Sequence, residues 1–199
     1  MSQTPAAPAA KQPAKPSVIA KQAAKPSVKA NPMRAPYIQK IVVNIGVGEG
    51  GEKLVKATKV LEMLTKQKPV KTISKTINRE WGIRIGMPIG CKVTLRGEPA
   101  DDFLKRALWI TQNKVVVYSF DKEGNFSLGV KDYTDFQGMK YDPEIGIFGL
   151  DISVTMRRRG GASIPLRKRN SQPLPKKQRL TTKESIEFLK NRFQIEVVR

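Results

Sequence analysis

The distribution of charge along the chain limits which part of it can form a folded core. Residues 1–35 hold six Lys or Arg and no acid, and residues 157–179 hold nine, again with no acid. Between them, residues 36–156 carry 18 basic and 14 acidic residues. Segments of dense like charge repel one another unless an anion lies between them. We therefore predict one nearly balanced domain at 36–156, flanked by basic extensions at 1–35 and 157–179.

The N-terminal extension has the composition of an unfolded segment. Residues 1–35 contain six prolines, which interrupt any helix, and too little apolar surface to offset the entropy of ordering. We expect this arm to be extended or disordered when free. It is either a nucleic-acid-binding arm or a plain spacer.

The formal net charge of +20 predicts a polyanionic partner. Nucleic acid is favoured over lipid, because no apolar run approaches the ~20 residues of a membrane span. The chain has no histidine and only Cys91 as cysteine, which argues against imidazole catalysis, an intramolecular disulfide and a multi-cysteine metal site. We predict no cofactor, no metal and, without a secretory signal, a cytoplasmic location.

Apolar periodicity predicts the order β, α, β, β, α, β, β, β for the central domain. That order indicates an α+β fold, in which helices pack on one face of a largely antiparallel sheet. A further helix is expected within 180–199, since Thr181 and Glu184 have capping-box spacing. The expected strands lie at about 37–45, 70–76, 91–96, 115–120, 126–130 and 150–156, and the other helices lie between Gly51 and Pro69 and at 98–111.

Strand alternation predicts that the sheet has one polar face. Cys91, Val93 and Leu95 point to one side of their strand, and the polar residues between them point to the other. The neighbouring strands alternate in the same way. The polar face is either an ordinary solvated surface or, given the basic extensions, a surface for sugar and phosphate oxygens. It lacks aromatic residues for stacking unpaired bases, so structured RNA is the favoured partner.

A glycine-rich segment offers an alternative. Residues 46–51 read GVGEGG, which matches the G-x-G-x-x-G pattern of dinucleotide-binding turns between a strand and a helix. A nucleotide-dependent enzyme would use this loop. The next strand ends in Lys75 and Thr76 without an acid for a ribose, and the chain lacks alternating β and α units. A tight strand-to-helix turn in a protein that is not an enzyme is the favoured interpretation.

Five motifs stand in order along the central domain: KIVVNIGVGE at 40–49, TKQKP at 65–69, IRIGMPIGCKVTLRG at 83–97, GNFSLGV at 124–130 and GLDISV at 149–154. Together they resemble the ribosomal protein L5 family of the large subunit. The resemblance implies a structural protein that binds 5S rRNA in the central protuberance, approaches P-site tRNA with a loop and bridges to a small-subunit head protein. The terminal extensions resemble the archaeal type. A general polyanion or membrane-surface adaptor remains a further alternative.

The resemblance also implies site residues, and the basic extension adds its own. The terminal helix is expected to pack on the domain or on a neighbouring ribosomal protein. The 5S rRNA residues would be Asn44, Gln67, Lys92, Thr94 and Arg96; the tRNA loop at 78–88 would use Arg79, Trp81, Arg84 and Met87; the intersubunit bridge would use Tyr133, Phe136 and Tyr141; and Arg157, Arg158, Arg159, Arg167, Lys168 and Arg169 would contact the large-subunit rRNA.

Overall fold

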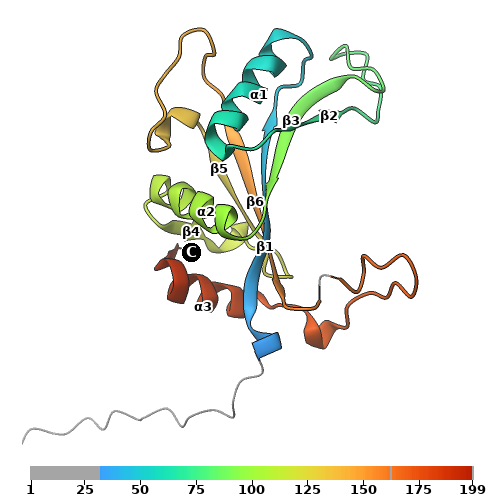
Figure 1. The fold of residues 1–199 in the computed structure, drawn as a ribbon, viewed down its shortest axis with the longest axis vertical. Coiled ribbons are helices and arrows are strands. Elements are labelled where there is room, and N and C mark those ends of the chain that lie inside the picture. Colours follow the sequence, from blue (N-terminus) through green and yellow to red (C-terminus); the bar gives the residue numbers. More distant parts are fainter. Residues whose placement is uncertain (1–31, 162, 199) are drawn as a thin grey trace, which may run out of the picture. The chain divides into compact units, whose positions relative to one another are not determined.

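Alternating β-branched residues build a five-stranded sheet in which all neighbouring strands are antiparallel. The strand order is β2-β3-β1-β6-β5 (Figure 1). The central strand, β1, comes from the start of the domain and pairs with β6 from its end. The computed structural model describes residues 32–161 and 163–198, and most of the predicted N-terminal arm lies outside that part. The strands are β1 (Pro36–Gly46), β2 (Val70–Ile73), β3 (Pro88–Leu95), β5 (Phe126–Val130) and β6 (Leu150–Arg158).

Three helices cover one face of this sheet: α1 (Glu52–Thr65), α2 (Glu98–Ile110) and α3 (Thr182–Phe193) (Figure 1). Gly51 and Gly97 precede α1 and α2 with φ values of 104° and 67°, which favour glycine at both helix starts. The predicted capping box of α3 is present. The α+β prediction is therefore confirmed. Short 3₁₀ helices lie at η1 (Pro32–Arg34), η2 (Val117–Ser119), η3 (Tyr133–Asp135) and η4 (Lys176–Gln178).

The last residues of the chain complete the core. The strand expected at 115–120 is only β4 (Lys114–Val116), and it pairs in parallel with β7 (Glu196–Val198) outside the main sheet. Leu180, Leu189 and Ile195 are buried with the residues of the central domain. Residues 32–161 and 163–198 accordingly belong to one compact unit. No helix of the described ranges is long and apolar enough to cross a membrane.

Cys91 lies at the middle of the buried face of β3, fully shielded from solvent. Burial raises the pKa of its thiol, and a hydrogen bond with the Thr58 side chain opposes that shift in part. The folded chain therefore retains the thiol proton at a pH where the unfolded chain loses it. The contribution of the thiol to the free energy of unfolding is complete below its pKa in the unfolded chain, about 8.5, and is lost as pH rises through its pKa in the folded chain.

We expect the free energy of unfolding to fall more steeply above pH 9 in the wild type than in Cys91→Val. Urea titrations at pH 7 and at pH 10 measure this difference. Parallel pH dependence in the two proteins would contradict it. In native buffer the thiol should resist a charged disulfide reagent, because only the unfolded chain exposes it.

Candidate nucleic-acid interface

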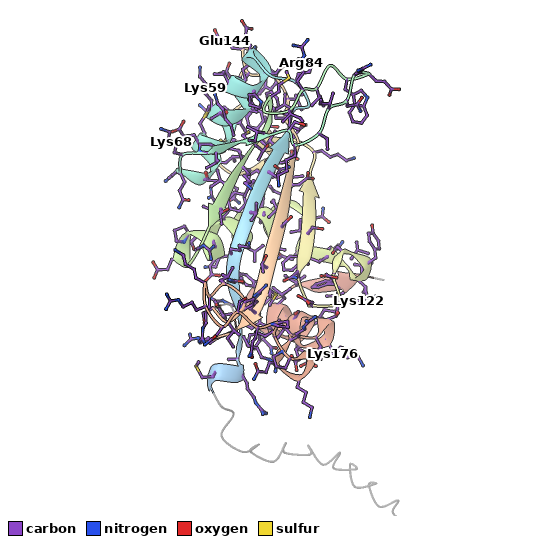
Figure 2. All side chains as sticks on the ribbon, turned by 90° about the vertical axis from the view of Figure 1, so that its right-hand side faces the viewer. Lys59, Lys68, Arg84, Lys122, Glu144 and Lys176 are labelled. Carbon is purple, nitrogen blue, oxygen red and sulfur yellow. The ribbon has the colours of Figure 1, made fainter. Side chains whose placement is uncertain are left out.

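The sheet face opposite the helices is open, and polar side chains line it (Figure 2). Along β3, Lys92 and Thr94 are exposed, whereas the residues beside them are buried. The same alternation runs through β1, β5 and β6. The predicted division into an apolar and a polar face is therefore observed. We call the polar surface of these strands the open face.

Strand register places the open-face residues in rows across the sheet. Asn44 of β1 lies between Lys92 of β3 and Asp151 of β6. Residues directly opposite each other in an antiparallel pair have Cβ atoms ~5 Å apart, so a ligand on the sheet can contact several at once. The amide and the ammonium donate, and the carboxylate accepts. The next rows contain Thr94, Val42, Ser153 and Ser127, and then Lys40 and Thr155.

The other two predicted 5S rRNA residues lie at one end of the sheet. Arg96 is exposed directly after β3. Gln67 is exposed in the turn after α1 and lines one hollow with Leu95 and Arg106. The guanidinium of Arg106 donates to the carbonyl of Leu64 over 3.3 Å, which joins α2 to the end of α1. Gln67 therefore lies beside a hollow between the end of α1 and α2, and not in a row of the open face.

In the glycine-rich loop at 46–51, two of the backbone amides that a phosphate would need are already hydrogen-bonded. The backbone amides of Val47 and Gly48 both donate to the carbonyl of Ile89, over 3.1 and 2.9 Å. Glu49 and Glu52 place two carboxylates at the start of α1. Glu49 is paired with Lys53 over 3.0 Å, whereas Glu52 would repel a nucleotide's phosphates. With two amides already bonded to Ile89, the loop is a strand-to-helix turn. Among the described residues, no cluster of three or more His, Cys, Asp or Glu could hold a metal ion.

The loop that joins β2 to β3, residues 74–87, exposes three of its four predicted residues. Its base is closed where the amide of Ser74 donates to the Met87 carbonyl over 2.8 Å. Trp81 has 72% of its surface exposed and is therefore not a core residue. Arg79 and Arg84 are exposed beside it. Met87 instead packs against Gly50, where an added Cβ would lie 3.1 Å from its Cε.

Two of the three predicted bridge residues are core residues. Tyr133 and Phe136 are 2% and 1% exposed, and the Phe136 ring stacks on Phe103 of α2 with centroids 5.6 Å apart. Their rings stabilise the fold and cannot contact a partner directly in this conformation, which corrects their assignment as contact residues. Tyr141 is 57% exposed and is available for contact.

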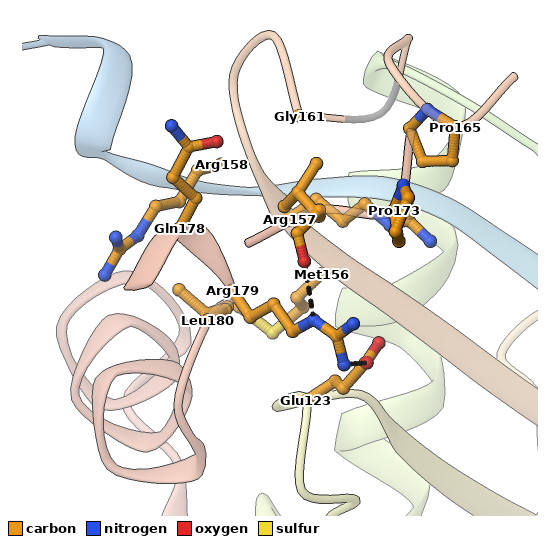
Figure 3. A pocket seen from close by; sticks show the side chains of 11 residues that line it. Glu123, Met156, Arg157, Arg158, Gly161, Pro165, Pro173, Gln178, Arg179 and Leu180 are labelled. Carbon is orange, nitrogen blue, oxygen red and sulfur yellow. Dashed lines mark hydrogen bonds and ion pairs between the residues drawn. The ribbon is translucent and has the colours of Figure 1, made fainter. Parts of the chain in front are cut away.

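Two arginines of the basic extension form ion pairs with acidic residues elsewhere in the folded chain. The guanidinium of Arg158 donates to both carboxylate oxygens of Glu184 on α3, over 2.8 and 2.7 Å, and its side chain is only 19% exposed. This pairing gives Arg158 a role in the fold, and its contact with rRNA stays a prediction. Arg179 reaches across to Glu123, with 2.8 Å between the paired atoms (Figure 3). Arg157 is half-buried in β6, opposite Tyr37. The other predicted residues, Arg159, Arg167, Lys168 and Arg169, are exposed.

Comparisons with known proteins agree along nearly the whole described chain. Residues 31–84 match the family described as Ribosomal protein L5, and residues 88–188 match the one described as ribosomal L5P family C-terminus. The large ribosomal subunit protein uL5 of Thermoplasma volcanium is 50% identical over 169 residues, which cover 85% of this chain and 99% of that protein. The uL5 proteins of Picrophilus torridus and Methanoregula boonei are 51% and 49% identical, over 84% and 83% of this chain and 96% and 99% of their own.

Proposed function

The chain belongs to the ribosomal protein L5 family, and on that basis we propose that its open face binds 5S rRNA in the central protuberance. As a member of that family it is a structural, non-enzymatic protein of the large ribosomal subunit in the cytoplasm. The observation that carries the proposal is the register that sets Lys92 beside Asn44 and Thr94 one row away, on a face that none of the described helices covers.

The chemistry of the rows suits the backbone of structured RNA. Lys92 and Arg96 supply charge to phosphates, and Asn44 and Thr94 supply hydrogen bonds that fix the register of the RNA on the sheet. The open face of the described strands carries a single aromatic side chain, the half-buried Tyr37 opposite Arg157 at one end of β1, so it offers no row of rings on which unpaired bases could stack. Recognition therefore depends on the shape of a folded RNA and its sugar and phosphate groups.

Asp151 gives this basic surface a specific acceptor. It is exposed in the row of Asn44 and Lys92, where a phosphate would be repelled. A carboxylate accepts hydrogen bonds from a ribose 2′-hydroxyl or from the exocyclic amine of a base. Asp151 thus binds a donor group of the RNA next to a phosphate held by Lys92. This arrangement favours RNA over DNA, since DNA lacks the 2′-hydroxyl.

Two further contacts complete the proposal. The 74–87 loop approaches P-site tRNA with Arg79, Trp81 and Arg84, because an exposed indole between two guanidiniums can stack and pair with a nucleotide. Tyr141 is the residue of the 131–149 segment that contacts the small-subunit head protein. Met87 supports the loop from behind through its packing on Gly50.

Removing one hydrogen-bonding group from the open face tests the central proposal. We expect Thr94→Ala or Asn44→Ala to weaken 5S rRNA binding about fivefold, the equivalent of ~1 kcal/mol, without changing the salt dependence. Fluorescence anisotropy with labelled 5S rRNA, with tRNA and an unrelated duplex as competitors, measures it. The matched control is Asn191→Ala, an exposed amide on α3. Equal losses in Asn44→Ala and Asn191→Ala would refute the open face as the site.

A further inference from the structure

Strand β2 lies at the edge of the sheet and has one side without a partner strand. Among the described strands only β3 pairs with it, and Figure 1 shows it at the margin of the sheet beyond β3. No backbone hydrogen bond from the rest of the described chain reaches its outer side. Alternate residues of a strand direct their N–H and C=O groups to opposite sides, so part of the β2 backbone faces outward.

The side chains of β2 are exposed as well as its backbone. Val70 and Ile73 have 62% and 60% of their surfaces exposed. Edge strands are commonly covered or charged, because an exposed apolar edge pairs with other chains. β2 carries Lys71, but the described helices leave both of its apolar residues uncovered. It therefore has the two features by which one strand recruits another, a free backbone edge and exposed β-branched side chains.

A hollow beside β2 can receive a side chain of an added strand. It has a volume of about 540 Å³ and lies between the first turns of α1 and the edge formed by β2 and β3. Its apolar floor is formed by Leu54, Val55 and Pro88, and Val55 is 49% exposed. Lys71 is paired with the buried Cys91, so this hollow is on the helix side of the sheet. We call it the edge groove.

Three lysines, Lys56, Lys59 and Lys71, surround the apolar floor of the edge groove. Within the described part of the chain none of them has an ion-pair partner. Glu52 is the one acid among the described lining residues, so positive charge is in excess. A lysine can lay its methylene stem on an apolar surface and direct its ammonium to a nearby carboxylate. The edge groove therefore suits an apolar side chain that has acidic residues on either side.

The floor and the charges distinguish between possible occupants. A second copy of the chain would bring the same three lysines against their equivalents, and like charges repel. The phosphates of an RNA would pair with the lysines, but they would gain nothing from Leu54, Val55 and Pro88, and Glu52 would repel them. A protein segment with apolar and acidic residues uses the free backbone, the floor and the lysines together.

We propose that β2 and the edge groove bind an extended segment of another protein by strand addition. The segment adds a sixth strand to the sheet, in which main-chain hydrogen bonds supply affinity and the groove supplies specificity. The residues of the segment that face the helices are acidic, apolar and acidic in turn. Because the groove lies on the helix side, this site is separate from the RNA proposed for the open face.

The test uses the full chain and a fluorescein-labelled peptide, Gly-Glu-Val-Leu-Thr-Glu-Gly, whose two Glu and one Leu fall on the same face of a strand. The groove variant is Lys56→Gln, Lys59→Gln and Lys71→Gln; the control is Lys122→Gln, Lys140→Gln and Lys190→Gln at exposed positions elsewhere. By fluorescence anisotropy at 0.1 M salt, we expect about a tenfold loss of peptide affinity in the groove variant, because its exposed ion pairs with the peptide are lost. The control should lose at most about twofold.

Two further variants separate binding from folding. Val55→Glu places a carboxylate in the floor of the edge groove, where it should repel the peptide at least as strongly as the loss of the lysines weakens it. An acid is favourable in the first turn of a helix, so α1 should remain intact. Replacing the same three lysines by Arg should retain peptide binding, which excludes misfolding as the cause of the loss.

N-methylated peptides test the strand geometry. Methyl groups on alternate amides remove the donors along one edge of the peptide and leave the other edge intact. Strand addition predicts that one of the two alternately methylated peptides binds like the parent and that the other loses binding. If both bind like the parent, charge attraction alone holds the peptide and the proposal is overturned.

Equal losses in the groove and control variants would also overturn the edge groove. A loss of affinity for an unrelated RNA duplex in the groove variant that exceeds its loss for the peptide would assign the groove to RNA. A wild-type dimer that Val55→Glu dissociates would assign it to a second copy. If Asn44→Ala leaves 5S rRNA binding intact while the groove variant loses the peptide, the open face is wrong and the edge groove stands.

Discussion

Raising monovalent salt from 50 to 200 mM should weaken binding of 5S rRNA to the full chain on the order of a thousandfold. About six basic residues that neutralise phosphates give a slope near −5.4 in log affinity against log salt, because each contact releases condensed counterions. Basic residues of the open face and of the turn around Gln67 supply that number: Lys40 and Arg157 are half-buried, and Lys66, Lys68, Lys92 and Arg96 are exposed.

Binding across a salt series at constant magnesium measures this slope. Thr94→Ala is the control, because its hydroxyl carries no charge and its loss should shift the line without tilting it. A wild-type slope near −1 would mean that phosphates contribute little. The affinity would then come from hydrogen bonds on the sheet.

Phe136→Ala should lower the free energy of unfolding by about 3–5 kcal/mol, the range for a buried Phe reduced to Ala. The ring is 1% exposed and stacks on Phe103, so its removal leaves a cavity between α2 and the 131–149 segment. Urea denaturation of the free protein measures the change.

The matched control is Tyr141→Ala in the same segment. Its ring is mostly exposed, so we expect a change within ~0.5 kcal/mol in stability. The two variants separate a folding role from a contact role. A loss below 1 kcal/mol in Phe136→Ala would contradict its place in the core, and a loss of subunit joining in Tyr141→Ala at full stability would support its contact.

Local patterns predict much of this molecule, as β3 illustrates. Its alternation is encoded in neighbouring residues, so Lys92 and Thr94 could be placed on the polar face before their strand partners were known. The boundaries of α1 and α2 follow from flanking glycines and Pro69 in the same way. The rows of the open face could not be predicted, because register depends on pairing between distant strands.

Long-range pairs account for the errors. In the sequence, Arg158 is one more basic residue in a basic run, and only the folded structure shows that it pairs with Glu184. Tyr133 lies in a segment without helical or strand periodicity, so its burial left no pattern to detect. Arg34 and Lys177 line one hollow although they are far apart in the sequence, so their proximity could not be predicted either. Asp151 was missed because one acid in a strand has no distinctive spacing.

The central position of β1 has a consequence for how the chain is made. β1 pairs with β6, the last of the five strands to be synthesised, so Ile41 and Val43 have an incomplete sheet around them until residue 158 has left the exit tunnel. The acid that holds Arg158 follows later still, on α3. An interrupted translation product that stops before Glu184 would retain the basic run without the carboxylate that holds Arg158 in the finished fold.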